Sequence, residues 1–191
     1  MKHRSILMMA VGSLLISGAA IAAQPLVTDP SLPRTISSGS TVTVSWGDPA
    51  QFTEITRSGN RAEAARGKWV TELAQYLGDN ASTRLDEGQQ LSLTLTDIDL
   101  AGDYEPWLGP RMHDVRMVRD IYPPRLSIEF SLTDANGQVV DQGERTLSDL
   151  GYLNGLNTAR KSTETLRYEK RMIDRWLQQE FGPEHAMTAH K

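Results

Sequence analysis

Four carboxylates lie close together in the middle of the chain: Asp97, Asp99, Asp103 and Glu105. Clustered carboxylate oxygens are the ligands that calcium prefers in proteins. The EF-hand pattern, however, needs a further ligand where Ala101 stands and a carboxylate where Leu108 stands, and only Gly102 fits it. We therefore predict neither a metal ion nor a cofactor for this segment.

The same stretch contains arginines and no lysine: Arg111, Arg116, Arg119 and Arg125. Guanidinium groups suit planar, bidentate contact with carboxylates or phosphates. The simpler interpretation is structural, with the arginines fastening the segment to the fold by pairing with Asp97, Asp99, Asp114 and Asp120. The alternative is a binding site for an anionic ligand or an acidic partner peptide.

Catalytic chemistry has less support in this sequence. His113 is the only histidine between residues 41 and 182, and its neighbour Asp114 would be needed to make it a base. No nucleophile elbow, zinc-binding helix or phosphate-binding glycine loop is present. The paired carboxylates would suit glycoside hydrolysis only across a cleft, which a sequence does not reveal. We predict no catalytic residues.

The N-terminus is typical of a secretory signal peptide. Basic residues Lys2 to Arg4 precede an apolar run from Ile6 to Ile16, and small residues end at Ala23. The run is shorter than the roughly 20 residues that a membrane-spanning helix needs, so we predict cleavage of residues 1–23 and no integral membrane segment afterwards. We expect a periplasmic protein, with secretion into the medium as the alternative.

Charge and cysteine content limit the functions and the covalent features that this protein can have. The chain has 20 basic and 24 acidic residues, and removal of Lys2 and Arg4 leaves 18 against 24. This acidic balance does not favour binding to nucleic acid. There is no cysteine, so disulfides and a lipid-modified N-terminal cysteine are excluded.

Three segments alternate between apolar and polar residues, as strands with one buried face do: residues 41–46, 90–96 and 125–133. A fourth strand, residues 138–147, is predicted because Asn136 and Gly137 favour a hairpin before it. Residues 24–40 are rich in proline and serine and predict a flexible, irregular N-terminal arm.

Two helices are predicted. The first covers residues 61–77, with Asn60 as its cap and Gly78 as its end. The second follows a cap at Ser162 or Thr163 and ends before Gly182-Pro183, leaving residues 183–191 as a loose tail. Their apolar residues recur at helical spacing: Ala65, Trp69, Leu73 and Leu77 in the first, and Leu166, Ile173, Trp176, Leu177 and Phe181 in the second.

The alternating strands determine the expected layers. Strands covered by helices on both faces are continuously apolar, so the helices here should cover one face only. The order strand, helix, strand, strand, strand, helix predicts an α+β fold. We expect a two-layer sandwich, with two helices on one face of a four-stranded mixed sheet, formed by a single domain of residues 41–182.

The connection of residues 97–124 is long for a compact domain, and such connections are usually either functional or disordered. Tyr104, Trp107 and Tyr122 are expected to anchor it, and Gly-Pro and Pro-Pro pairs stiffen it. We therefore predict an ordered, packed segment.

Residues 42–181 resemble a known family. The similar segments run from Thr96 to Trp107, over Gly109-Pro-Arg, Asp114-Val-Arg and Arg119-Asp-Ile-Tyr-Pro-Pro-Arg125, and later over Leu166-Arg-Tyr-Glu-Lys-Arg171 with Trp176. They are similar to a family of exported proteins of Gram-negative bacteria that is classed as a domain of unknown function. The resemblance implies an exported bacterial protein and supplies no activity.

These features predict a non-enzymatic periplasmic protein that binds an envelope protein or a small anionic ligand through the segment 97–125. The candidate binding residues are Asp97, Asp99, Asp103, Glu105, Trp107, Arg111, Asp114, Arg116, Arg119, Asp120, Tyr122 and Arg125. The alternative is an envelope hydrolase or metal-dependent enzyme that uses the same carboxylates with His113. A homo-oligomer that pairs through an uncovered sheet edge is a third interpretation, and the oligomeric state is not predicted.

Overall fold

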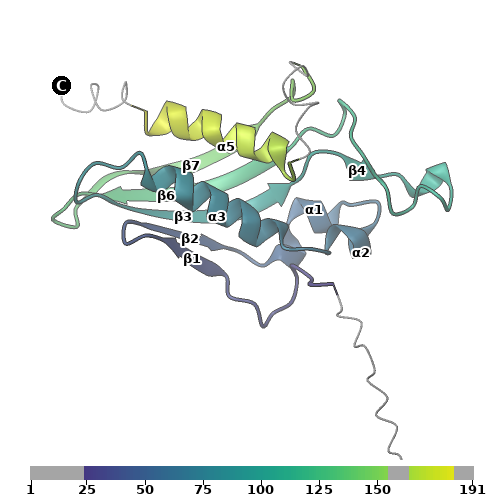
Figure 1. Ribbon diagram of the computed structural model, residues 1–191, viewed down its shortest axis with the longest axis horizontal. Helices are drawn as coiled ribbons and strands as arrows, with labels where there is room; N and C mark the ends of the chain where they lie inside the picture. The colour runs from purple at the N-terminus through teal and green to yellow at the C-terminus, as the bar shows by residue number, and fades with distance from the viewer. Residues whose placement is uncertain (1–23, 155–163, 183–191) are drawn as a thin grey trace, which may run out of the picture.

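The structure is a computed structural model that describes residues 24–154 and 164–182. It contains a five-stranded sheet in the order β1-β2-β3-β6-β7 and a separate β4–β5 pair (Figure 1). The strands are β1 (Thr35–Ser38), β2 (Val42–Trp46), β3 (Gln90–Asp99), β4 (Asp103–Tyr104), β5 (Arg116–Met117), β6 (Arg125–Thr133) and β7 (Val139–Ser148). The helices are η1 (Pro49–Gln51), α1 (Thr53–Thr56), α2 (Arg61–Ala64), α3 (Trp69–Ser82), η2 (Pro106–Leu108) and α5 (Arg167–Glu180).

The sheet is mixed because β2 and β3 run parallel, whereas the other neighbouring strands are antiparallel. The α+β class with a mixed sheet is therefore confirmed. The β6–β7 pair is joined by the predicted hairpin, in which Asp134 accepts a hydrogen bond from the Asn136 N–H at 2.8 Å and Gly137 has a φ of 77°.

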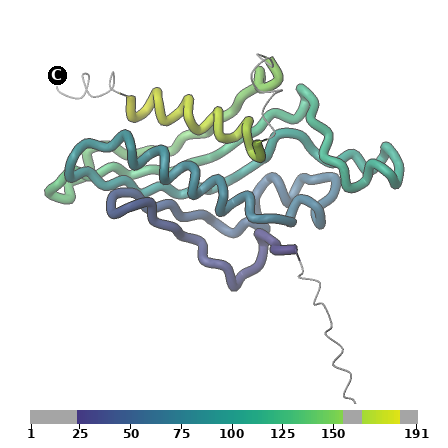
Figure 2. Tube along the Cα trace, viewed as in Figure 1, coloured from purple at the N-terminus to yellow at the C-terminus, as the bar shows by residue number. Residues whose placement is uncertain are grey.

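One face of the sheet forms the core. Val44, Leu93 and Phe130 occupy one row across β2, β3 and β6, and all three are buried. Figures 1 and 2 show α3 and α5 along the same side of the sheet, and these helices contact each other. Trp176 of α5 packs edge-on against the Phe130 ring, with 6.3 Å between ring centroids.

The main sheet has five strands rather than the predicted four. The fifth, β1, lies within residues 24–40, so the expectation of an irregular arm is wrong there. A four-residue strand with Ile36 as its one apolar residue has no readable alternation. Tertiary contacts hold it instead: Ser38 is buried, and its hydroxyl donates to Asp79 of α3 at 2.9 Å.

The predicted continuous helix over residues 61–77 is also wrong. It is divided into α2 and α3 around Gly67, whose φ of 96° is outside the helical region. Gly78 does not end α3, which continues to Ser82. Glycine is needed at position 78 because the helix lies so close to β1 and β2 that a Cβ there would be 2.4 Å from the Ser38 hydroxyl.

Several predictions lie outside the described residues: the signal peptide over residues 1–23, the helix caps Ser162 and Thr163, and the tail over residues 183–191. Within residues 24–154 and 164–182, no helix has the length and apolar character to cross a membrane.

We expect Gly78→Ala to lower the free energy of unfolding by about 1–3 kcal/mol, because the added methyl group overpacks the contact with Ser38 and Val44. This sign is opposite to the gain of about 1 kcal/mol that alanine brings to an unconstrained helix position. Urea unfolding monitored by circular dichroism measures the change.

The double variant Ser38→Ala/Gly78→Ala serves as the control, because it removes the hydroxyl that the new Cβ would meet first. The two substitutions should be non-additive, with the second costing less in the presence of the first. A Gly78→Ala protein that is as stable as the parent would contradict the close approach.

Candidate functional site

The connection between β3 and β6 forms a projection from one end of the sheet, which Figure 1 shows extending beyond β4, away from α3 and α5. It begins at Leu100, because β3 continues to Asp99. The expected start at Asp97 is therefore wrong. A bulge between Leu95 and Asp97 shifts the register, so that the strand continues and Ile98 faces the core.

A buried carboxylate, Glu54 of α1, holds the base of the projection. Its side chain is 3% exposed, and its Oε2 accepts a hydrogen bond from the Leu100 N–H at 3.0 Å. Glu54 also forms an ion pair with Arg116 of β5, whose Nη1 donates to the Gly102 carbonyl at 2.7 Å. This one pair therefore joins α1 to both strands of the projection.

Glu169 of α5 provides a second buried acceptor at the same place. Its Oε1 accepts a hydrogen bond from the Ala101 N–H at 2.7 Å. The consecutive amides of Leu100 and Ala101 have left the β3 ladder and are buried, so each needs an acceptor other than a neighbouring strand. Two glutamates from different helices supply these acceptors.

A third buried carboxylate, Glu105, braces the projection further out. The Tyr122 hydroxyl donates to its Oε1 at 2.9 Å, and Arg119 forms an ion pair with its Oε2 at 2.7 Å. The fully buried Tyr152 then donates its hydroxyl to the Arg119 carbonyl. The segment is thus ordered and packed at its base.

Burial raises the pKa values of three carboxyl groups at the base of the projection. Burial raises the pKa of Glu54 to about 7, although Arg116 and the Leu100 amide oppose the shift. Burial also raises the pKa of Asp99, and the neighbouring Asp97 charge adds to the effect. Burial raises the pKa of Glu169 against the opposing Ala101 hydrogen bond. All three carboxyls therefore hold protons more tightly than in an unfolded chain.

The predicted aspartates mostly serve as local acceptors. Asp97 accepts hydrogen bonds from the Thr53 amide at 2.7 Å and the Thr53 hydroxyl at 2.6 Å, at the start of α1. Asp103 accepts from the Gly59 amide at 3.2 Å and the Ser58 hydroxyl at 3.3 Å. Both side chains thereby attach the β3 end to the α1 region.

The structural interpretation of the arginines holds for two of the four, but with other partners. Arg116 and Arg119 pair with Glu54 and Glu105 rather than with the expected aspartates. Arg111 is exposed and forms no ion pair with the described residues.

Glu54 lies in a stretch without apolar periodicity, so only its placement in the fold reveals its importance.

His113 lies at the outer part of the projection rather than in a cleft. Its Nδ1 lies 2.9 Å from the Asp114 carboxylate and 3.0 Å from Asn60 Nδ2. Asn60 also donates to Asp114 at 3.1 Å and caps α2, so this cluster fastens the projection to α2. The His113 side chain is half exposed, which favours the solvated interpretation.

The three aromatic residues of the segment do not act alike. Tyr104 is buried and Tyr122 is half-buried, as expected of anchors. Trp107, in η2, is 68% exposed, so the expectation that it anchors the segment is wrong. Trp107 is instead an exposed aromatic side chain on a braced support.

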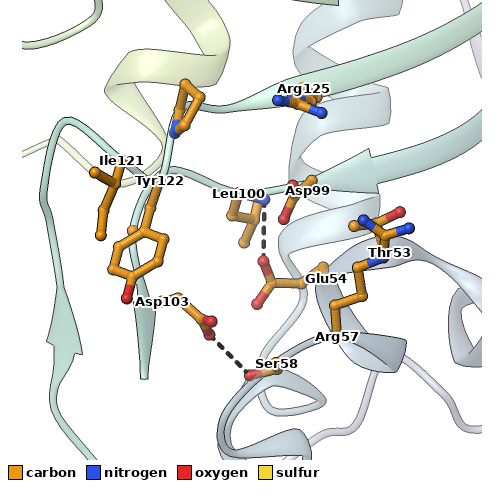
Figure 3. A pocket seen from close by; sticks show the side chains of 12 residues that line it. Thr53, Glu54, Arg57, Ser58, Asp99, Leu100, Asp103, Ile121, Tyr122 and Arg125 are labelled. Atoms are coloured by element: carbon orange, nitrogen blue, oxygen red, sulfur yellow. Dashed lines mark hydrogen bonds between the residues drawn. The ribbon is translucent and has the colours of Figure 1, made fainter. Parts of the chain in front are cut away.

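A pocket of about 190 Å³ lies between α1 and the base of the projection (Figure 3). Charged side chains that line it include Glu54, Arg57, Asp99, Asp103 and Arg125. Of these, Asp99 and Arg125 stand opposite each other on β3 and β6. Sequence reasoning identified the strand residues but missed Glu54 and Arg57, which reach the pocket from a separate segment.

The carboxylates do not converge as metal ligands would. In the part of the chain that the structure describes, no three histidine, cysteine, aspartate or glutamate side chains are grouped so as to hold a metal ion. Asp97, Asp103 and Glu105 each accept hydrogen bonds from nearby protein groups instead.

The raised pKa of Glu54 predicts a pH dependence of stability. The folded chain binds this proton with a pKa of about 7 and the unfolded chain with a value near 4.5, so the Glu54 contribution makes the protein less stable as pH rises between these values. Glu54→Gln should therefore flatten the decline in stability between about pH 5 and about pH 8. Urea unfolding across this range, with the exposed Glu144→Gln as the matched control, tests it. Equal slopes in parent and Glu54→Gln proteins would refute the assignment.

Arg119→Ala should destabilise the fold rather than leave it intact, because it leaves the buried Glu105 carboxylate without its cation. Breaking a fully buried pair costs about 3–5 kcal/mol, and because Arg119 is 44% exposed we expect a smaller loss of about 1–3 kcal/mol. Arg111→Ala is the matched control and should leave thermal unfolding unchanged. Equal stability of both variants would show that the Arg119–Glu105 pair does not brace the projection.

Comparisons with known proteins give a family and no activity. No curated protein and no solved structure matches the chain. The family model described as protein of unknown function (DUF3016) matches residues 40–179, which include strands β2 to β7, the projection and nearly all of α5. The chain therefore belongs to this DUF3016 family.

Proposed function

We propose that the protein is a non-enzymatic periplasmic binding module that holds another component of the cell envelope with the tip of its projection, residues 105–115. The observation that carries this proposal is the 68% exposure of Trp107 on a support with a braced base. Isolated exposed apolar residues are ordinary on protein surfaces, but tryptophan is among the residues that contribute most to interfaces.

The bracing supports binding as well as stability. The ion pairs from Arg116 to Glu54 and from Arg119 to Glu105 hold the projection at two levels. A surface that is already ordered loses less conformational entropy when a partner binds. Trp107 is thus presented by a preorganised structure.

The surroundings of Trp107 suit a mixed interface. Leu108 and Val115 in the tip are 44% and 43% exposed. Arg111 and Asp114 are exposed within the same tip segment. Apolar anchors with polar residues at the rim are the usual composition of a protein–protein contact.

The periplasmic part of the proposal is supported by the N-terminal sequence, in which Lys2 to Arg4 precede an apolar run and small residues. The hydrolase alternative has less support, because Asp97, Asp103 and Glu105 already accept hydrogen bonds from the protein.

A photo-cross-linking amino acid at position 107 should form one discrete adduct in intact cells. The same residue at Val140, which is 54% exposed and lies near the β6–β7 hairpin, is the matched control and should form none. Deleting residues 2–23 should abolish the adduct, because the chain would no longer reach the partner. Identical adducts at positions 107 and 140 would refute the role of the tip.

With the captured partner purified, Trp107→Ala should weaken binding by about 30-fold, the equivalent of the 2 kcal/mol that marks an interface hot spot. Thermal unfolding should be unchanged, because the Trp107 side chain is mainly exposed. Undiminished affinity of the variant would rule out Trp107 as the anchor.

A further inference from the structure

The pocket beneath the projection contains three charged groups that the protein itself does not neutralise by direct bonding. The side chains of Arg57, Asp99 and Arg125 form no hydrogen bond or ion pair within residues 24–154 and 164–182. Glu54 and Asp103, in contrast, already accept hydrogen bonds from Arg116, from Ser58 and from backbone amides. The chemistry that the pocket offers a ligand therefore comes from two guanidinium groups and one carboxylate.

The three groups come from three different elements. Arg57 follows α1, Asp99 ends β3, and Arg125 begins β6 directly opposite Asp99. In Figure 3 they lie on one side of the pocket, whereas Ile121 and Tyr122 lie on the other. The pocket thus has a charged wall and a wall with apolar surface.

Two guanidinium groups are suited to a carboxylate, which each can contact with paired N–H donors. Asp99 is suited to an ammonium group. It is half-buried, and burial with the nearby Asp97 charge raises its pKa although Arg125 and Arg116 oppose the shift, so a further cation in contact with Asp99 would lower this pKa.

The size of the pocket limits the ligand. About 190 Å³ is less than the roughly 300–1,000 Å³ of sites for drug-sized molecules. A molecule with both charged groups and only a short apolar side chain fits this space.

We propose that the pocket binds a small free α-amino acid, whose carboxylate contacts Arg57 and Arg125, whose ammonium contacts Asp99, and whose side chain lies against Ile121 and Tyr122. This site is separate from the tip that contains Trp107.

L-alanine is the probe, with propionate and ethylammonium as matched compounds that each lack one charged group. Heteronuclear NMR titration of the purified protein should show alanine binding with shifts at residues 57, 99 and 125. Propionate and ethylammonium should bind at least about tenfold more weakly, because each loses one charge-assisted contact. The pKa of Asp99, followed by carboxyl NMR, should fall when alanine is bound.

Substitutions of the three charged residues test whether alanine binds in this pocket. Arg57→Gln, Arg125→Gln and Asp99→Asn should each weaken alanine binding by at least about tenfold. Arg111→Gln and Asp120→Asn change equivalent exposed charges in the projection outside the pocket and should keep the parent affinity. Arg57 is exposed and unbonded within the described residues, so its variant should remain folded.

Three results would overturn the proposal: absence of alanine binding, propionate binding as tight as that of alanine, or an equal loss of affinity in the Arg111 and Asp120 controls. Trp107→Ala must leave alanine binding unchanged, so this result and the test of the tip can fail independently.

Discussion

Burial of two glutamates at the end of β3 is the constraint on which the rest of the structure depends. Glu54 and Glu169 accept hydrogen bonds from the successive amides of Leu100 and Ala101, where the chain leaves the sheet. A buried amide without an acceptor costs about 1–3 kcal/mol, and a buried carboxylate without donors costs more. Each group therefore requires the other, and together they fix the direction in which the projection leaves the body.

The same interaction gives the molecule two separate surfaces. Arg116 connects Glu54 to β5 and so stabilises the outgoing and returning strands of the projection at once. Glu54 also lines the pocket from its inner side. The tip with Trp107 and the pocket with Asp99 thus share this support but present different chemistry: an exposed aromatic group in one case, and in the other charged side chains that form no direct bond with the described residues.

Periodicity in the sequence was sufficient to predict much of the sheet. β6 covers the predicted residues 125–133, and β2 covers nearly all of residues 41–46, because each alternates residues between a core face and a polar face. The hairpin residues Asn136 and Gly137 located β7 to within one residue at each end, whereas β3 runs three residues past its predicted end. The resemblance of residues 42–181 to a family of unknown function was also confirmed, by the family model that matches residues 40–179. Such local information needs no knowledge of distant contacts.

Tertiary structure decided what depends on contacts between distant segments. β1 pairs with β2 although Ile36 is its one apolar residue, and Gly78 lies within a helix because β1 approaches that helix closely. Arg116 pairs with Glu54, which is 62 residues earlier in the sequence, rather than with the nearby aspartates. A buried carboxylate is stabilised by a cation, and Glu54 is buried whereas those aspartates are not. Local sequence patterns determined the strands and the family. The pocket and the braced tip depend on contacts between residues far apart in the sequence, and no local pattern specifies which residues those contacts join.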